Sequence, residues 1–133
     1  MNKIRAFVTA LGLVILAGGL SAQTELKDVA EVRDGIIHVG MAYEISQECD
    51  GIRARTFRGI GYLQSLKNRA RELGYSAEDI DAYVNDRAEK RRLEQIARDR
   101  LAALGAVAGD AETYCAVGRA QIDADTRVGW LLR

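Results

Sequence analysis

The chain has 133 residues, and its 19 basic and 19 acidic side chains give a formal net charge of zero. A chain of this length forms one small domain, and it lacks the basic excess that is typical of nucleic-acid-binding proteins. Proline is absent, and Ala, Leu, Arg and Glu are frequent, so the composition favours helices over strands.

The first 22 residues have the pattern of a cleaved secretory signal. Lys3 and Arg5 precede an uncharged, mostly apolar run from Ala6 to Leu20, and the small Ala22 follows. The run is shorter than the roughly 20 residues of a typical membrane span, although an uncleaved anchor is the alternative. We therefore predict cleavage near Ala22 and a periplasmic or secreted location. Cleavage would leave a net charge of −2, and with export this predicts no nucleic-acid partner.

The chain after the signal is predicted to begin with a flexible arm over residues 23–33, or with an added helical turn or two. A single helical domain over residues 34–133 follows. Asp34 is the expected N-cap of its first helix, and Gly51 lies just past the end of that helix. The buried side of the helix is expected at Ile37, Met41, Ile45 and Cys49.

A second helix is predicted over residues 52–73, and Gly74 suits the position after its end. Its apolar side, expected to be buried, consists of Phe57, Ile60, Leu63, Leu66, Ala70 and Leu73. The third helix has the clearest start signal in the chain, because Ser76 is placed to cap the amide of Asp79. We expect that helix to run to about Leu104.

The last predicted helix begins after Asp110, and the apolar residues at the end of the chain are expected to dock as a short final turn. The prediction is thus an all-α fold, a compact bundle of about four helices after the signal. The two cysteines, Cys49 and Cys115, both follow the signal. An even count in an oxidising compartment predicts one disulfide between them, and redox catalysis would favour a closer pair such as C-x-x-C.

Catalytic and metal-binding patterns are weak. The single histidine, His38, lies one helical turn from Met41, but Met41 fits the apolar side of its helix and no zinc-ligand spacing accompanies the pair. We therefore predict no metal, no cofactor and no catalytic residue, and no small-molecule substrate is identifiable. An enzyme with a pocket around Tyr43, Tyr62 or Tyr83 is a weaker alternative.

The second predicted helix carries basic residues on one side. Arg55, Arg58, Tyr62 and Arg69 share that side, and no acidic residue occurs between Gly51 and Arg71. Such a patch could contact an acidic protein partner or an anionic membrane surface. The alternative is an ordinary solvated surface whose arginines pair with acidic residues of neighbouring helices.

Several stretches resemble a bacterial family of small exported helical proteins that is known only as a domain of unknown function. They are "ARTFRGIGYLQSLKNRARELGYS", "LGYSAEDIDAYVNDRAEK", "GDAETYCAVGRAQI" and the terminal "GWLLR", and the resemblance extends from about Asp34 to Arg133. It implies no activity, cofactor or catalytic residue. The main hypothesis is a non-enzymatic accessory or protein-interaction module. Its alternatives are a periplasmic acid-stress chaperone that holds unfolded proteins and, from the resemblance, a factor associated with a respiratory membrane complex.

Overall fold

The computed structural model describes residues 22–133. Apart from two isolated β-bridges, the regular secondary structure of this part is helical. In chain order the helices are η1 (Leu26–Asp28), α1 (Ala30–Glu48), α2 (Thr56–Glu72), α3 (Ala77–Val84), α4 (Arg87–Ala103), α5 (Ala111–Asp123) and α6 (Arg127–Trp130). The predicted all-α fold is confirmed. The signal predicted for residues 1–22 lies, up to residue 21, outside the described residues.

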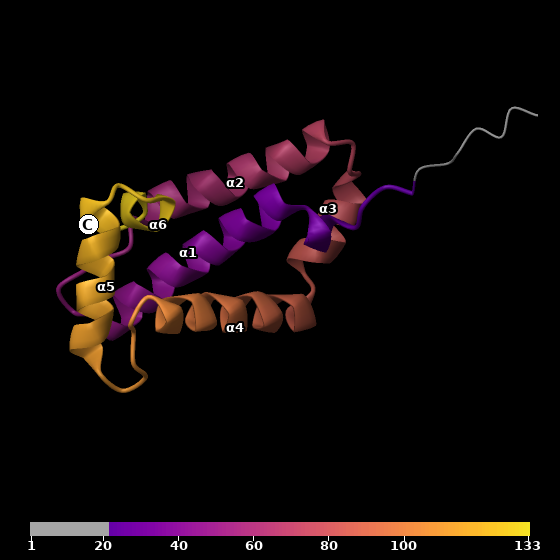
Figure 1. Cartoon of the computed structure of the whole chain (residues 1–133). Helices are drawn as coiled ribbons and strands as arrows, with labels where there is room; N and C mark the ends of the chain where they lie inside the picture. Colours follow the sequence, from indigo (N-terminus) through magenta and orange to yellow (C-terminus); the bar gives the residue numbers. More distant parts are fainter. Residues whose placement is uncertain (1–21) are drawn as a thin grey trace, which may run out of the picture.

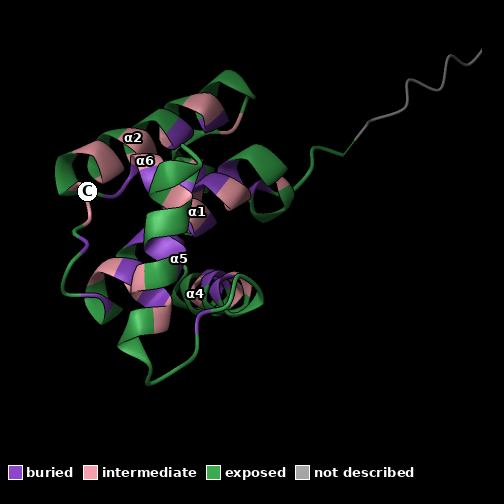
Figure 2. Cartoon of the chain, turned by 60° about the vertical axis from the view of Figure 1, so that its left-hand side comes forward, coloured by how far each residue is buried: buried purple, intermediate pink, exposed green. Residues whose placement is uncertain are grey.

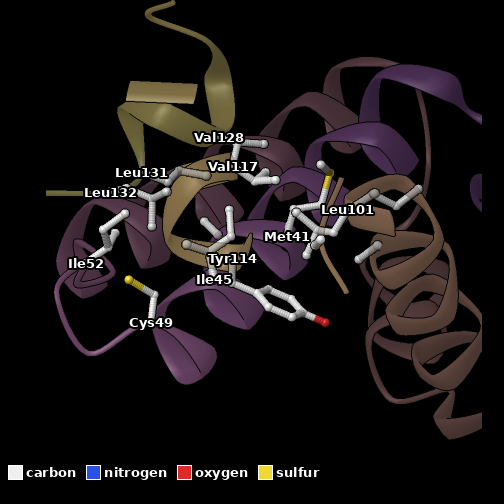
Figure 3. Close-up of a cluster of buried hydrophobic side chains, with 14 of the residues drawn as sticks. Met41, Ile45, Cys49, Ile52, Leu101, Tyr114, Val117, Val128, Leu131 and Leu132 are labelled. Carbon is white, nitrogen blue, oxygen red and sulfur yellow. The ribbon is translucent and has the colours of Figure 1, made fainter. Parts of the chain in front are cut away.

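Helix α1 is the centre of the fold. Helices α2 and α4 flank it, and α5 and α6 lie across its C-terminal half (Figure 1). The helices turn their buried residues toward one another and leave exposed residues on the outside (Figure 2). The main core joins Ile37, Met41 and Ile45 of α1 to residues of α4, α5 and the C-terminal segment, including Leu101, Val117, Leu131 and Leu132 (Figure 3). The predicted buried side of α1 is therefore confirmed.

The start of α1 differs from the prediction. The helix begins at Ala30, four residues before the expected N-cap Asp34, which lies inside the helix and pairs with Arg100 of α4. Leu26 and Val32 are buried in a second cluster with residues of α2 and α3. Residues 26–33 thus form helical turns that precede residue 34, as the second of the two expected alternatives has it, and the burial of Leu26 and Val32 holds them on the rest of the fold.

In the structure, two helices, α3 and α4, replace the third predicted helix. As expected, the Ser76 hydroxyl accepts a hydrogen bond from the Asp79 amide at the start of α3. The chain then breaks at residues 85–86, where the Asp86 carboxylate accepts from the amides of Ala88 and Glu89 and starts α4. A short acidic side chain satisfies the free amides of a helix start better than it fits a helix interior, and this explains the break.

Helix α2 begins at Thr56 rather than near residue 52, and the prediction of its buried side is wrong for three residues. Leu66 and Ala70 are buried, but Phe57, Ile60 and Leu73 are exposed, Phe57 at 90% of its surface. A helical apolar pattern shows which side chains lie together, but another element must cover them to bury them. Near Phe57 and Ile60, no described element does so.

The disulfide between Cys49 and Cys115 is confirmed, with the two Cα atoms 5.2 Å apart. Cys49 ends α1 and is 1% exposed, and it lies beside Ile52 and Leu132 in the core (Figure 3). Cys115 lies in α5. The bond therefore joins the end of the central helix to a helix that comes much later in the sequence.

Candidate functional site: an apolar groove along helix α1

Three sides of α1 are in close contact with other helices. A Cβ atom at Gly35 would lie 2.7 Å from Leu66 of α2, and one at Gly40 would lie 3.3 Å from the Cβ of Ala97 of α4. On the third side, a Cβ at Gly118 of α5 would lie 2.8 Å from Ile45. A Cβ atom at Gly35 or Gly118 would therefore require a neighbouring side chain to move, and one at Gly40 would make a tight contact with Ala97.

The fourth side of α1 borders a hollow. Ile36, Val39 and Tyr43 recur there at helical spacing and line a hollow of about 690 Å³. Its walls come from α2 and α4, and η1 and α3 close one end. A second hollow of about 440 Å³ shares Val39, Tyr43 and Leu63 with the first and continues past Ile60 to residues 53–56. We call these two adjoining hollows together the α1 groove.

Exposed apolar side chains gather along the α1 groove. Tyr43 and Ile60 line it, and each is 58% exposed. Val84 of α3 lines the other end and is also exposed. Phe57 lies one helical turn before Ile60. Covering a large apolar side chain contributes about 1.5–3 kcal/mol, and contiguous exposed apolar surface is typical of interaction sites.

Two polar groups that line the α1 groove are buried, the Tyr83 hydroxyl and the Glu89 carboxylate. The Tyr83 hydroxyl oxygen is buried and has no hydrogen-bond partner among the described residues. Burial raises the pKa of Tyr83 to about 12, and the negative charge of Glu89 acts in the same direction. Glu89 is itself buried and accepts two hydrogen bonds from Arg92, at 2.7 and 2.8 Å. At neutral pH the tyrosine is therefore a neutral phenol.

The predicted basic patch divides into two groups of contacts. Arg55 Nε donates to the Leu132 carbonyl at 2.8 Å, and Arg58 Nη1 donates to the Trp130 carbonyl at 2.9 Å. The Arg58 guanidinium also lies 4.7 Å from the centre of the Trp130 ring, which Tyr62 meets edge-on. These three residues hold the C-terminal segment on α2.

Arg69 lies farther along the same side of α2. Its guanidinium pairs with Glu31 of α1 at 2.9 Å and with Glu72 at 3.2 Å. The contacts of Arg69 are those of the alternative interpretation, in which the arginines pair with neighbouring acidic residues. A role of the four patch residues in binding a partner stays a prediction.

Of the three tyrosines singled out from the sequence, Tyr43 and Tyr83 line the α1 groove, and Tyr62 packs against Trp130 on another side of α2. The sequence pattern did not predict the groove itself. The spacing of Ile36, Val39 and Tyr43 was the one available signal, and it cannot show whether another helix covers them.

His38 faces a different part of the molecule, near α4 and α6. Burial lowers the pKa of His38, and the charges of Arg100 and Arg127 lower it further, whereas Asp34 opposes them. Its Nδ1 atom is buried without a hydrogen-bond partner among the described residues. The neighbouring Met41 packs in the core, as expected. Within residues 22–133 no cluster of three or more metal-ligating side chains occurs.

Within the same residues, no helix combines the length and the apolar character that a membrane crossing requires. In comparison with known families, the model of the family of unknown function DUF5333 matches residues 24–133. Neither the curated proteins nor the solved structures provide a significant match.

Proposed function

The chain belongs to DUF5333, a family of unknown function, and we propose that it is an exported, non-enzymatic accessory module that binds a protein partner in the α1 groove. The observation that carries this proposal is the groove itself, about 690 Å³ in its larger part and bordered by the exposed side chains of Tyr43 and Ile60. A protein segment that covered these side chains would remove them from water.

Export is supported by two independent features. The N-terminal charged and apolar residues have the pattern of a secretory signal. The Cys49–Cys115 bond also suits an oxidising compartment such as the periplasm, because cytosolic reductants keep most thiols reduced. Both features agree with a protein that folds after it leaves the cytosol.

A polypeptide suits the α1 groove better than a compact small molecule does. The open side of α1 runs from Ile36 to Gln47, which is 12 residues or about 18 Å along the helix axis. A groove of this length, open along its side and lined by apolar residues of two helices, is the usual receptor for a helix of a partner.

The proposal is tested by photocrosslinking in the bacterium that makes the protein. A photoreactive amino acid at Leu63, in the groove, should crosslink a partner protein, and the same probe at the exposed Leu104 should not. Mass spectrometry of the product also separates a soluble partner from a subunit of a respiratory membrane complex. A groove probe that captures no protein, or only those that the Leu104 probe captures, contradicts the proposal.

A matched pair of variants tests the apolar contact. Ile60→Asp should abolish the crosslink from Leu63, because a carboxylate would have to be buried in the interface. Val107→Asp changes a residue of similar exposure, 55% against 58%, outside the groove and should leave the crosslink unchanged. Both residues are exposed, so neither variant should change the thermal melting curve by more than a small amount.

An acid-activated chaperone is the second candidate, and a specific arrangement of ion pairs favours it. Asp34 pairs with Arg100 at 2.9 Å and Glu44 pairs with Arg98 at 3.5 Å, so two ion pairs join α1 to α4. Burial opposes the ionisation of Asp34, but the hydrogen bonds and charges of Arg100 and Arg33 outweigh it and lower its pKa. Protonation of Asp34 at low pH would remove its attraction to Arg100 and loosen the contact between α1 and α4.

The test of this second candidate is dye binding and suppression of client aggregation, measured from neutral pH down to about pH 2, well below the ordinary pKa of aspartate, because the pKa of Asp34 is lowered. The chaperone hypothesis predicts that both rise together as the carboxylates are protonated. Unchanged dye binding over that range, with an unchanged melting transition, would rule it out.

A further inference from the structure

We propose that the smaller hollow of the α1 groove, about 440 Å³, binds an anionic amphiphile, an acyl chain that ends in a carboxylate or phosphate group. A free fatty acid and an anionic membrane lipid both have this chemistry. The inference goes beyond the proposed function, because it concerns a ligand that is not a protein. A partner segment that filled the whole groove would compete with this ligand for the residues that both hollows share.

The lining of the smaller hollow differs in charge from that of the larger one. Four carboxylates and two lysines line the larger hollow, so its charges do not select one kind of ligand. Arg53 and Arg55 line the smaller hollow, and no acidic residue of the described chain does. Glu48 and Asp50, the acidic residues nearest to them in sequence, are not among the lining residues. The smaller hollow therefore favours a negatively charged group.

Both arginines combine a fixed backbone with available donors. The Arg53 amide donates to the Arg133 carbonyl at 2.8 Å and the Arg133 amide donates back at 2.9 Å, while the Arg55 amide donates to the Leu131 carbonyl at 2.8 Å. Arg55 Nε donates to the Leu132 carbonyl. Within residues 22–133, the Arg55 Nη atoms and the Arg53 guanidinium form no ion pair. Guanidinium groups bind carboxylate and phosphate through paired hydrogen bonds, and a backbone already held in place lowers the entropy lost on binding.

The rest of the lining suits an acyl chain. Val39 of α1, Leu63 of α2 and Leu131 of the C-terminal segment contribute apolar walls, and the exposed Tyr43 and Ile60 line the hollow as well. Its volume lies within the range of ligand pockets, about 300–1,000 Å³. Each methylene group that leaves water should strengthen binding by about fourfold. The affinity should therefore rise with chain length until the hollow is full.

The test is isothermal titration calorimetry of the oxidised protein, as the expressing bacterium processes it, with ligands kept below the concentration at which they form micelles. Dodecanoate should bind about tenfold more tightly than the uncharged dodecanol, because only the carboxylate pairs with the arginines. Octanoate should bind more weakly than dodecanoate, and added salt should weaken dodecanoate alone. Equal affinities for dodecanoate and dodecanol, or binding of neither, would overturn the proposal.

A charge change identifies the arginine side of the site. Arg53→Glu should remove the preference for dodecanoate over dodecanol. Arg91→Glu, the same charge change at an exposed residue of α4 outside both linings, should keep it. Arg53 is exposed, so the variant should fold, and a melting curve checks this. If the glutamate does destabilise the fold, Arg53→Gln should still reduce the preference. An unchanged preference in the folded variant contradicts the proposal.

Two glycines of α2 allow a matched steric test. A Cβ atom at Gly59 or at Gly61 would meet no other atom within 4 Å, but only Gly59 lines the smaller hollow. Gly59→Phe should fill the hollow and weaken both dodecanoate and dodecanol at least about tenfold. Gly61→Phe should bind both ligands as the wild-type protein does. If the two variants bind alike, the ligand occupies another site and the proposal fails.

A vesicle experiment separates the two sources of the ligand. The protein is sedimented with phosphatidylcholine vesicles that contain either no phosphatidylglycerol or about 30% of it. Sedimentation with the anionic vesicles that Arg53→Glu abolishes identifies a membrane lipid, and dodecanoate binding without such sedimentation identifies a free fatty acid. A dimer in sedimentation velocity that Gly59→Phe dissociates would show that a second copy covers the hollow, and it would refute the proposal. None of these measurements depends on a partner being captured by the Leu63 probe.

Discussion

Removal of the Cys49–Cys115 disulfide should destabilise the protein by an amount that the structure allows us to work out. The bond joins residues 66 positions apart, and it holds the end of α1 against α5. In the chain-entropy account, a cross-link closing a loop of this length removes about 15 cal/mol/K of entropy from the unfolded chain, or about 4 kcal/mol at 25 °C. Folded domains of this size are stable by only about 5–15 kcal/mol.

The assay is urea unfolding of the wild-type protein, with and without reductant, and of the Cys49→Ala, Cys115→Ala double variant. With a urea m-value of about 2 kcal/mol/M, the loss should lower the midpoint by about 2 M. Cys49 is 1% exposed, so the double variant should be less stable than the reduced wild type by the packing that its sulfur contributes. If reduction of the disulfide lowers the urea midpoint of the wild-type protein by less than about 0.5 M, the reasoning is refuted.

Two further predictions concern a close backbone approach and the buried histidine. Gly129→Ala would place a Cβ atom 2.0 Å from the Gln121 backbone oxygen and should lower the free energy of unfolding by at least about 2 kcal/mol. Gly61→Ala has open space around the new atom and should stabilise α2 by about 0.5–1 kcal/mol. Equal urea midpoints for the two variants would contradict this prediction. The lowered pKa of His38 means that the unfolded chain binds more protons as pH falls below about 6.5, so stability should decrease from pH 7 to pH 5. His38→Gln should flatten that decrease, and an identical pH slope in the variant would show that another group causes it.

Local signals in the sequence predicted much of the fold. Ser76 caps α3, and Gly74, just past the end of α2, has a positive φ of 94°, as its position requires. The repeat of Ile37, Met41 and Ile45 marks the buried side of α1. The disulfide followed from a simple count, because two cysteines allow only one intramolecular pair. Each of these features depends on neighbours in the sequence or on a choice with few alternatives.

The break between α3 and α4 was missed although its signal is local. The residues around Asp86 read equally well as the exposed middle of a long helix, and the side-chain cap decides against that reading. The partners of Arg55 and Arg58 could not be predicted, because they are backbone carbonyls that lie 77 and 72 residues later in the chain. A pattern of charges shows where arginines lie on a helix, but it does not show what they contact.

The sequence by itself determined that this chain is helical, where α3 and α5 begin, where α1, α2 and α4 end, and which two sulfurs pair, because turns, caps and periodicity act over a few residues. Only the tertiary structure decided which apolar side chains are covered. Ile45 and Ile60 both lie on apolar sides of their helices, yet one is fully buried and the other is 58% exposed at the α1 groove. Burial depends on whether a distant segment packs against that side, and the packing of three helices around α1 leaves its fourth side open.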